Sequence, residues 1–435
     1  MSSTGTSTRS SPAAGLAGAG SRRPLPGLLL ALAVAGIGIG LVGLGTGLSA
    51  GEARPVISWL LGFSFWTSIL LGSLFFVMIF NLFDAGWSVL VRRQLEHLLA
   101  GFKWIAILFL PLLLIAWFYR DPGILWKWLN PEHILPNGYT VANDALYQAK
   151  EPYLNKTAFT LRSLLYLGVF LFFANALRRN SFGLDEDGDR SRVQRQKVLS
   201  GAGVFACGLA LTFAAIDWFM SIEFHWFSTM YGVWFFAASM RAALAFLLIL
   251  LFFQADRGVL QGLHRPSHNY QLGCIALAFT VFWAYISFSQ YFLIYQANIP
   301  EETFWYNIRH MNADGTTNSW WWVGLTLIFC NFLLPFLFLL FYKTKVRIPL
   351  ILFVAAWILT FHVVDLYFNI LPSKSAPADN VLNYKVRQFT INFWDVAVFV
   401  GIGALVLWAY LTSLRDKGAI PRRDPRIREA LEHHE

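Results

Sequence analysis

The sequence predicts an all-α integral membrane protein with about ten transmembrane helices. Of its 435 residues, 56% are hydrophobic and only 14% are charged, which is too little charge to cover the surface of a soluble domain of this length. Apolar runs long enough to cross a bilayer recur along the whole chain. Trp and Tyr gather near the ends of these runs, as they do at membrane–water interfaces.

The chain begins with residues 1–26, a tail of Ser, Thr, Gly, Ala and Arg that we expect to be disordered. The apolar run that follows is too long for a signal peptide and has a poor cleavage signal after it, so we expect a retained helix. The expected spans are residues 27–48, 56–83, 102–119, 158–177, 199–220, 230–253, 271–296, 319–342, 348–369 and 391–413. Residues 27–413 are therefore expected to form one transmembrane domain, with a long outer loop at 120–157, an inner loop at 178–198 and a C-terminal tail at 414–435.

The basic residues predict which side of the membrane each loop occupies. With the N-terminus inside, the inner segments carry 23 Lys and Arg residues and the outer segments carry 9. Cytoplasmic loops are enriched in Lys and Arg, so both termini are expected in the cytoplasm, consistent with an even number of spans. The formal net charge of +9 is explained by these loops and does not indicate a nucleic-acid partner.

A glycine-rich motif lies in the first apolar run, where residues 38–43 read G-x-G-x-x-G. A dinucleotide site needs a strand before this motif and an acidic residue after it, and the sequence provides neither. Gly36 with Gly40, and Gly43 with Gly47, instead form small faces on a helix. Such faces predict close packing against another transmembrane helix.

The sequence offers no ligand set for a metal cofactor. Cys207, Cys274 and Cys330 are far apart, without a CxxC or CxxCH motif, so no iron–sulfur cluster or attached haem is expected on this chain. Of nine histidines, only His362 lies deep in an expected span. If the protein works in electron transfer, haem c and iron–sulfur clusters belong to partner subunits.

Several ionisable residues fall inside the expected spans, where a charge costs roughly 2.5–3.5 kcal/mol at the helix centre. His362 and Asp365 are three residues apart, so they share a helix face and could hydrogen-bond with each other or with a third group. Tyr285, Ser289 and Gln296 project in similar directions and predict a polar stripe. The candidate residues of a proton pathway are Asp217, His362, Asp365, Asp395, Arg162, Arg241, Tyr285 and Ser289.

Structural interpretations of these residues stay open beside the functional one. Asp217 and Asp395 lie toward the outer ends of their spans and could simply reach water. His362 could be a histidine that ties helices together. The expected positions gather most of these groups at the outer side of the membrane, which suits an outward-facing half-channel better than a continuous pore.

Two polar, aromatic-rich stretches, residues 217–232 and 287–303, are too specific for generic membrane helices. On these stretches, and on residues 92–96 and 153–162, the chain resembles the NrfD-like membrane subunits of the polysulfide reductase type. It is most similar to the second of the two such subunits in alternative complex III, a bacterial quinol:cytochrome c oxidoreductase. The resemblance covers nearly the whole chain apart from its tails.

The resemblance implies two four-helix bundles, spans 2–5 and spans 6–9, with the first and last helices outside them. It implies a subunit in the bacterial inner membrane that is not catalytic alone. Its partners would be a multihaem cytochrome c subunit, an iron–sulfur subunit, the first NrfD-like subunit and small membrane subunits. Related subunits bind quinol near the outer surface, so residues that could flank a quinone here are Trp218, His225, Trp226, Gln290 and Tyr291.

Two other functions remain open from the sequence. A stand-alone secondary transporter often has helices broken by Gly or Pro near the midplane, and Pro111 and Pro335 interrupt the third and eighth spans. No clear internal repeat supports this reading. A purely structural membrane anchor is the third alternative.

Overall fold

The computed structural model describes residues 25–135, 138–260, 263–312, 314–372, 374–375 and 385–432. Within these residues, ten helical segments are long and apolar enough to cross a membrane. The predicted all-α membrane protein with ten spans is therefore confirmed. Residues 1–24, most of the tail expected to be disordered, lie outside the described residues.

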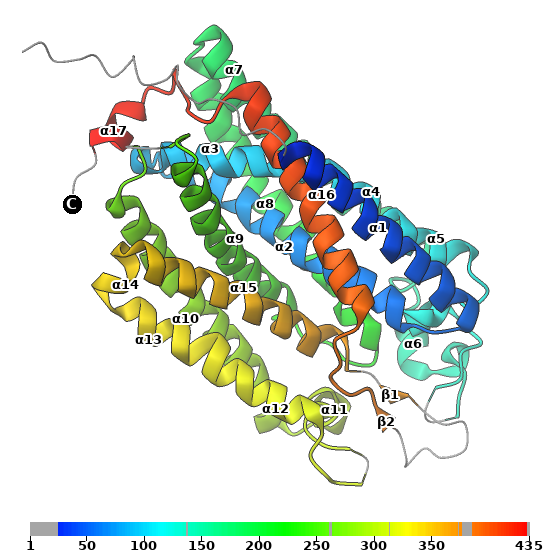
Figure 1. The fold of residues 1–435 in the computed structure, drawn as a ribbon. Coiled ribbons are helices and arrows are strands. Elements are labelled where there is room, and N and C mark those ends of the chain that lie inside the picture. Colours follow the sequence, from blue (N-terminus) through cyan, green and yellow to red (C-terminus); the bar gives the residue numbers. More distant parts are fainter. Residues whose placement is uncertain are drawn as a thin grey trace, which may run out of the picture.

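The first five spans occupy the N-terminal half of the chain (Figure 1). The third is a path of short helices joined by 3₁₀ turns, and the loop after it contains further short helices. The elements are α1 (Leu25–Ala50), α2 (Arg54–Leu82), a 3₁₀ turn (Gly86–Ser88), α3 (Val89–Leu98), a 3₁₀ turn (Leu99–Gly101), α4 (Phe102–Leu108), α5 (Leu110–Phe118), 3₁₀ turns at Pro122–Ile124, Lys127–Leu129 and Val141–Asn143, α6 (Ala145–Lys150), α7 (Lys156–Asp187) and α8 (Ser191–Trp218).

The last five spans follow a 3₁₀ turn at Met220–Glu223. They comprise α9 (Tyr231–Asp256), α10 (Pro266–Ala297), α12 (Ser319–Thr326) continued by α13 (Leu334–Leu340), α15 (Ile348–Ile370) and α16 (Phe393–Lys417). Shorter elements between or after them are α11 (Pro300–Asn307), α14 (Tyr342–Val346), the antiparallel pair β1 (Lys374–Ser375) and β2 (Lys385–Val386), and α17 (Ile427–Glu432).

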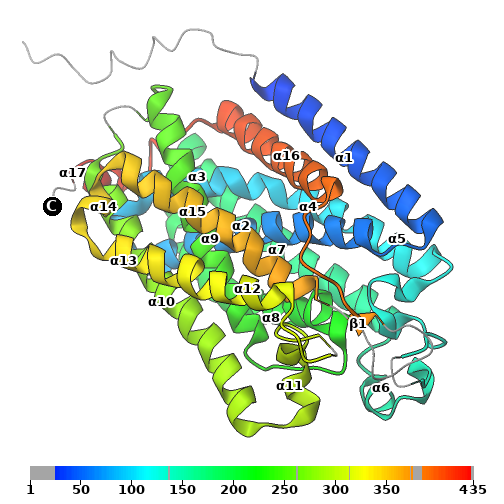
Figure 2. The same ribbon diagram turned by 60° about the horizontal axis from the view of Figure 1, so that its bottom comes forward.

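The helices form two bundles, as the resemblance implied. Spans 2–5 pack around α2 and α8, and spans 6–9 pack around α9, which also packs against α2 and joins the bundles. Helices α1 and α16 run side by side along one edge of the molecule in both Figure 1 and Figure 2. The most deeply buried helices are α2 and α9, and they carry polar side chains that water cannot reach.

The molecule has two ends, which we name by their connecting segments. The loop end contains the described residues of 51–53, 119–155, 219–230, 298–318 and 371–392. The tail end contains the described residues of 83–88, 188–190, 257–265, 341–347 and 418–432. Because the spans alternate in direction, every candidate residue can be placed relative to these two ends.

The glycine faces of α1 pack as the sequence predicts. A Cβ added at Gly36 would lie 2.6 Å from the Cα of Gly401 on α16. A Cβ at Gly43 would lie 2.5 Å from the ring of Trp394. Gly38, on another face of α1, has nothing within 4 Å of its added Cβ. Only the absence of side chains lets α1 approach α16 this closely.

Two segments that the sequence suggested as inner loops are largely helical. Helix α7 runs to Asp187 and α8 starts at Ser191, so the expected loop at 178–198 shrinks to a tight turn. Gly188 makes this turn with a φ of 72°, a left-handed conformation that glycine adopts without strain. Residues 89–98, before the third apolar run, form the amphipathic helix α3. These helices extend beyond the apolar stretches because polar residues can also form a helix once the chain has left the membrane.

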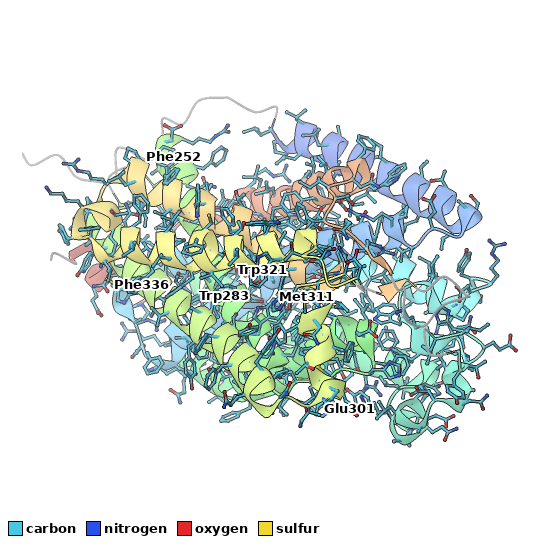
Figure 3. The ribbon with its side chains drawn as sticks, turned by 90° about the horizontal axis from the view of Figure 1, so that it is seen from below. Phe252, Trp283, Glu301, Met311, Trp321 and Phe336 are labelled. Carbon is cyan, nitrogen blue, oxygen red and sulfur yellow. The ribbon has the colours of Figure 1, made fainter. Side chains whose placement is uncertain are left out.

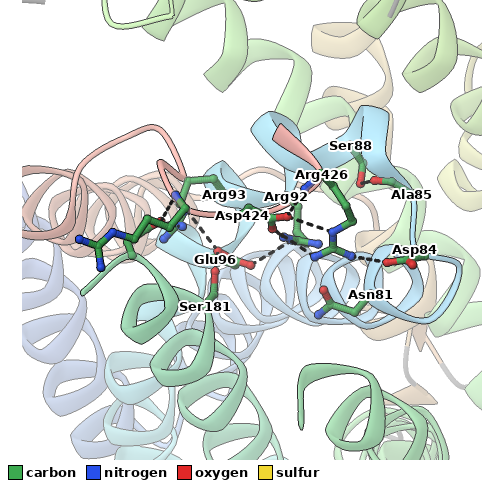
Figure 4. Close-up of polar contacts among 12 residues, drawn as sticks. Asn81, Asp84, Ala85, Ser88, Arg92, Arg93, Glu96, Ser181, Asp424 and Arg426 are labelled. Atoms are coloured by element: carbon green, nitrogen blue, oxygen red, sulfur yellow. Dashed lines mark hydrogen bonds and ion pairs between the residues drawn. The ribbon is translucent and has the colours of Figure 1, made fainter. Parts of the chain in front are cut away.

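The C-terminal tail packs back onto the tail end through ion pairs (Figure 4). Arg92 of α3 lies 2.5 Å from Asp424 and pairs with Glu96 at 3.2 Å. Arg426 pairs with Asp84 at 2.8 Å and with Asp424 at 3.0 Å. Burial alone would raise the pKa of Asp424, but the hydrogen bond from Arg426 and the nearby guanidinium charges lower it to about 2. The segment is thereby held against the bundle.

Candidate functional site

Asp365 is the carboxylate most deeply placed in the second bundle. It lies on α15 with only 2% of its surface exposed. Trp283 of α10 donates from Nε1 to Oδ2 at 2.9 Å, and Asn369 donates from Nδ2 to Oδ1 at 3.1 Å. Trp283 is labelled in Figure 3, within the layer formed by the second bundle. Hydrogen bonds to both oxygens fix the orientation of the carboxylate and satisfy the need of a buried polar group for hydrogen-bond partners.

Arg241 of α9 lies over the ring of Trp283. Its guanidinium carbon is 4.9 Å from the centroid of the Trp283 ring. It donates to the backbone oxygen of Asn331 at 2.9 Å and also to the Asn331 side-chain oxygen. Asn331 sits in a π-helical stretch, Leu327–Leu333, just before Pro335. Proline lacks a backbone N–H, and the helix changes to the π type at this point. The backbone oxygen of Asn331 is therefore free to accept the hydrogen bond from Arg241.

Arg309 extends the same chain of contacts to the loop end. It donates to the backbone oxygens of Trp305 at 2.7 Å, Phe368 at 2.9 Å and Asn369 at 3.1 Å. Asn369 in turn binds Asp365. Burial lowers the pKa of Arg309 to about 9, because its described hydrogen-bond partners are neutral oxygens. The guanidinium therefore keeps its proton at neutral pH at an electrostatic cost.

These contacts define what we call the Asp365 network: Arg309, Asn369, Asp365, Trp283, Arg241 and Asn331. It runs from the loop end into the interior of the second bundle and contains two guanidinium groups and one carboxylate. Burial penalises the charged carboxylate, and the charge of Arg241 stabilises it. Opposing influences of this kind mark a carboxyl group suited to taking up and releasing a proton.

His362 does not join Asp365, although both lie on α15. It is 1% exposed and its Nε2 lies 2.8 Å from the hydroxyl of Ser68 on α2. Its ring packs against Phe65 at 5.4 Å between centroids. Three residues separate two side chains by about 60° around a helix axis, and here that offset lets His362 contact α2 while Asp365 contacts α10. Each of the two side chains therefore hydrogen-bonds with a third group.

Asp217 and Arg162 form a second, independent cluster in the first bundle. Arg162 of α7 donates to both carboxylate oxygens, from Nε at 2.8 Å and from Nη2 at 3.1 Å. Tyr166 donates to the same carboxylate at 2.9 Å, and the guanidinium stacks 3.7 Å from the ring centroid of Tyr153. Asn155 caps the start of α7, which positions this face. Asp217 is 0% exposed, so it does not simply reach water.

Asp395 belongs to a third group, at the start of α16. Arg54 of α2 binds both of its oxygens, at 2.7 Å and 2.5 Å. Asp395 also accepts from the backbone N–H of Asn392 at 2.7 Å and completes a capping box. This geometry is a structural junction between α2 and α16, and its hydrogen-bond partners differ from those of Asp217 and Asp365.

Tyr285 and Ser289 lie apart from all three groups. Tyr285 is 63% exposed, Ser289 is half-buried and Gln296 is exposed on the same side of α10. The predicted stripe thus exists, but it faces away from the bundle interior that holds Asp365. Periodicity defines which residues share a face without revealing which face points inward.

The quinone-flanking candidates divide in a similar way. Gln290 donates to the hydroxyl of Tyr306 at 3.2 Å, and Tyr291 packs on the same ring at 5.1 Å. Trp226 stacks on Trp305 at 4.4 Å, beneath Arg309, so these three candidates meet beside the loop end of the Asp365 network. Trp218 instead packs in the first bundle, where it donates to Ser163 at 3.0 Å, and His225 binds Asp144 at 3.0 Å.

Sequence reasoning missed most of the partners in these groups. Arg309 was counted as a loop cation, yet it is 1% exposed. Asn331 and Asn369 are uncharged, so they lack the high energetic cost of a charge in the membrane that makes Asp365 and Arg241 conspicuous in the sequence. A usable signal for Asn331 was its position four residues before Pro335, where a helix must rearrange. Arg92, Arg93 and Glu96 precede the third apolar run, where nothing in the sequence indicates that they are buried.

Among the described residues, no group of three or more His, Cys, Asp or Glu side chains could hold a metal ion. In comparisons with known proteins, no family model and no curated protein matches the chain. The similarity to NrfD-like subunits accordingly stays a prediction based on the motifs, and the function has to be argued from the geometry.

Proposed function

We propose that this protein is a proton-handling integral membrane subunit of a quinol-oxidising respiratory complex. The observation that carries the proposal is the Asp365 network, in which a buried carboxylate connects the loop end to the interior of the second bundle. A carboxylate in this setting is expensive to retain, and such residues mark proton or ion pathways in membrane proteins. In this proposal the metal centres that accept electrons belong to partner subunits.

The chemistry proposed for the network is reversible protonation of Asp365. Trp283 and Asn369 orient its two oxygens, while Arg241 supplies positive charge. A proton that arrives at Asp365 removes its charge and weakens the attraction to Arg241. The charge of Arg241 would then favour release of that proton, so the group can pass protons on.

The aromatic group around Tyr306 is where we would place a quinone, if this subunit binds one. Gln290 and Tyr291 contact Tyr306, and Trp226 is connected to it through Trp305. Gln290 and Tyr306 supply polar atoms for a quinone carbonyl. The hydrogen bond of Gln290 to Tyr306, together with its acceptance from Ser228 at 2.9 Å, occupies these atoms internally. A quinone would have to displace them, so we treat proton handling as the primary role.

The decisive experiment is Asp365→Asn in the purified complex reconstituted into vesicles. The substitution keeps the size of the side chain and removes its ability to ionise. We expect quinol oxidation to continue while proton transfer through the subunit falls about a hundredfold, within the range for loss of an acid–base group. Proton movement is followed with a pH dye during quinol turnover.

The matched control is Asp416→Asn, which removes an exposed carboxylate at the tail end and should change neither rate. Equal proton movement in Asp365→Asn and the parent would remove the network from the mechanism. A purely structural anchor predicts that outcome for every charge-removing substitution, together with loss of the complex when the chain is deleted.

A stand-alone transporter is the second candidate, and the π-helical break beside Asn331 favours it. Broken helices that expose backbone oxygens are a recurring feature of transporter binding sites. Purification in a mild detergent separates the two functions. A respiratory subunit should bring haem-containing and iron–sulfur partners, visible in the absorption spectrum, whereas a transporter should come out alone.

A further inference from the structure

The outward side of α10 carries polar groups at membrane depth. Helix α10 packs on α9 and α13 and runs along the outer edge of the molecule in Figure 2. Tyr285 on this side is 63% exposed, and Ser289 is half-buried. Because α10 has 32 residues and rises 1.5 Å per residue, Tyr285 lies about 5 Å and Ser289 about 11 Å from its middle. With α10 centred in a hydrocarbon core about 30 Å thick, both residues lie inside that core.

Neither of these two hydroxyls is satisfied by the chain itself. Within the described residues, Tyr285 and Ser289 have no hydrogen-bond partner. Other hydroxyls of the spans bind their own helix: Thr280 and the exposed Thr360 each donate to the backbone oxygen four residues earlier, at 2.8 Å and 2.9 Å. Acyl chains offer neither a donor nor an acceptor, so an unpaired hydroxyl among them costs free energy. The two unpaired hydroxyls therefore point to a partner outside this chain.

The same side of α10 also carries small residues. Cys274 is half-buried and Ala278 is exposed, and at 100° per residue both lie within about 60° of Tyr285 and Ser289 around the helix axis. Small residues four apart let a neighbouring helix approach closely, and hydroxyl side chains hydrogen-bond across such contacts in membranes. This side of α10 thus has the two features of a helix–helix contact within the bilayer.

The exposed side of α8 provides a contrast. Between residues 199 and 220, the exposed residues of α8 are all apolar, namely Ala202, Phe205, Leu209 and Phe213. An apolar side of this kind suits direct contact with lipid acyl chains. The outward side of α10 differs from it in the two unpaired hydroxyls.

We infer that the outward side of α10 docks a transmembrane helix of a different membrane polypeptide, which places hydrogen-bonding side chains opposite Tyr285 and Ser289. A second copy of this chain fits poorly. In a two-fold contact the same residues meet each other, so Phe288 and Phe292, which are 62% and 49% exposed, would face their own counterparts. These large rings would hold the short Ser289 side chains apart. The inference does not depend on the proposed respiratory function.

The first experiment is photo-crosslinking in native membranes with p-benzoylphenylalanine in place of Phe288. The full-length chain is then purified, and its adducts are mapped by mass spectrometry. We expect an adduct with a transmembrane segment of one other polypeptide, with a Ser, Thr, Asn, Gln or His side chain within about one helical turn of the crosslink. The matched control has the same analogue in place of Phe205, which is 78% exposed on α8, and should give no polypeptide adduct.

The second experiment removes both hydroxyls with Tyr285→Phe and Ser289→Ala in one chain. The amount of the crosslinked partner that copurifies in mild detergent should fall about tenfold, the combined effect of two interhelical hydrogen bonds. Thr360→Val removes an exposed hydroxyl that is already bonded to its own helix, so it should leave the copurified amount unchanged. If the double variant does not reach the membrane, the crosslink alone decides.

Four results would overturn the inference. They are the absence of a polypeptide adduct at Phe288, an adduct with a second copy of this chain, an adduct segment without a polar side chain, and full retention of the partner by the double variant. Neither experiment measures proton movement or quinol oxidation. Failure of this inference is therefore distinguishable from failure of the proposed function.

Discussion

At the scale of single residues, buried charged side chains of this protein are stabilised by partners on other helices. Arg162 and Asp217 are 55 residues apart yet share two hydrogen bonds. Arg54 and Asp395 are 341 residues apart and also share two. Asp365 differs, because the donors to its carboxylate are the neutral side chains of Trp283, Asn369 and Trp234. This difference is why we propose Asp365, and not the two ion-paired carboxylates, as the group that exchanges protons.

The Arg162–Asp217 pair leads to a prediction about stability. Asp217→Asn leaves the guanidinium of Arg162 beside a neutral amide, and breaking a buried ion pair on one side costs about 3–5 kcal/mol. We expect the lower part of this range, since 20% of the Arg162 side chain is exposed. Denaturant unfolding of the purified protein in detergent measures the loss.

The double variant Arg162→Met with Asp217→Asn serves as the control for this prediction. It leaves no unpaired charge, so it should be more stable than Asp217→Asn alone. A double variant whose loss equals the sum of the two single losses would show that the pair is not coupled.

At the scale of helices, hydrophobic patterning located the spans well and their ends poorly. Each expected apolar run corresponds to a spanning segment, because length and hydropathy alone decide whether a helix can cross the bilayer. The run does not mark where the helix stops, as α7 and α8 show by extending through the charged segment at 178–198. Polar residues can continue a helix once it has left the membrane.

The candidate site was less predictable than the spans. The sequence singled out Asp365 and Arg241 by their cost in lipid, but not Trp283, which joins them, nor Asn369 and Asn331, which bind them. Trp283 and Asn331 come from helices that are distant in sequence from Asp365 and Arg241, so no local pattern brings them together, whereas Asn369 lies four residues after Asp365 on α15. Helical periodicity placed Tyr285 and Ser289 on one face, and only the packing of α10 turned that face outward.

The contact between α1 and α16 allows a prediction at this scale. Gly36→Leu places a side chain where the backbone of Gly401 already lies, and overpacking of this kind costs about 1–3 kcal/mol or more. Helix α1 should separate from α16, and the thermal unfolding temperature should fall. Gly38→Leu on the open face of the same helix should leave that temperature unchanged. Equal effects of the two substitutions would mean that the glycine contact is unimportant.

At the scale of the whole molecule, the two ends differ in charge and in structure. The tail end holds a dense set of ion pairs in which Arg92, Arg93 and Arg426 contact Asp84, Glu96, Asp185 and Asp424. The loop end holds the aromatic contacts around Tyr306 and the Arg309 end of the Asp365 network. In the function that we propose, the side from which Asp365 exchanges protons depends on which side of the membrane the loop end faces.

The distribution of basic residues predicts this orientation. The tail end and the flanking helix ends carry most of the Lys and Arg, and such segments remain in the cytoplasm. Glu132→Cys places a thiol at the loop end and Asp416→Cys places one at the tail end, both at exposed positions. A membrane-impermeant thiol reagent added to intact cells should label only Glu132→Cys. After the cells are opened it should label both, which confirms that each thiol is accessible. Labelling of Asp416→Cys alone in intact cells would reverse the orientation. In the function that we propose, Asp365 would then exchange protons with the cytoplasmic side.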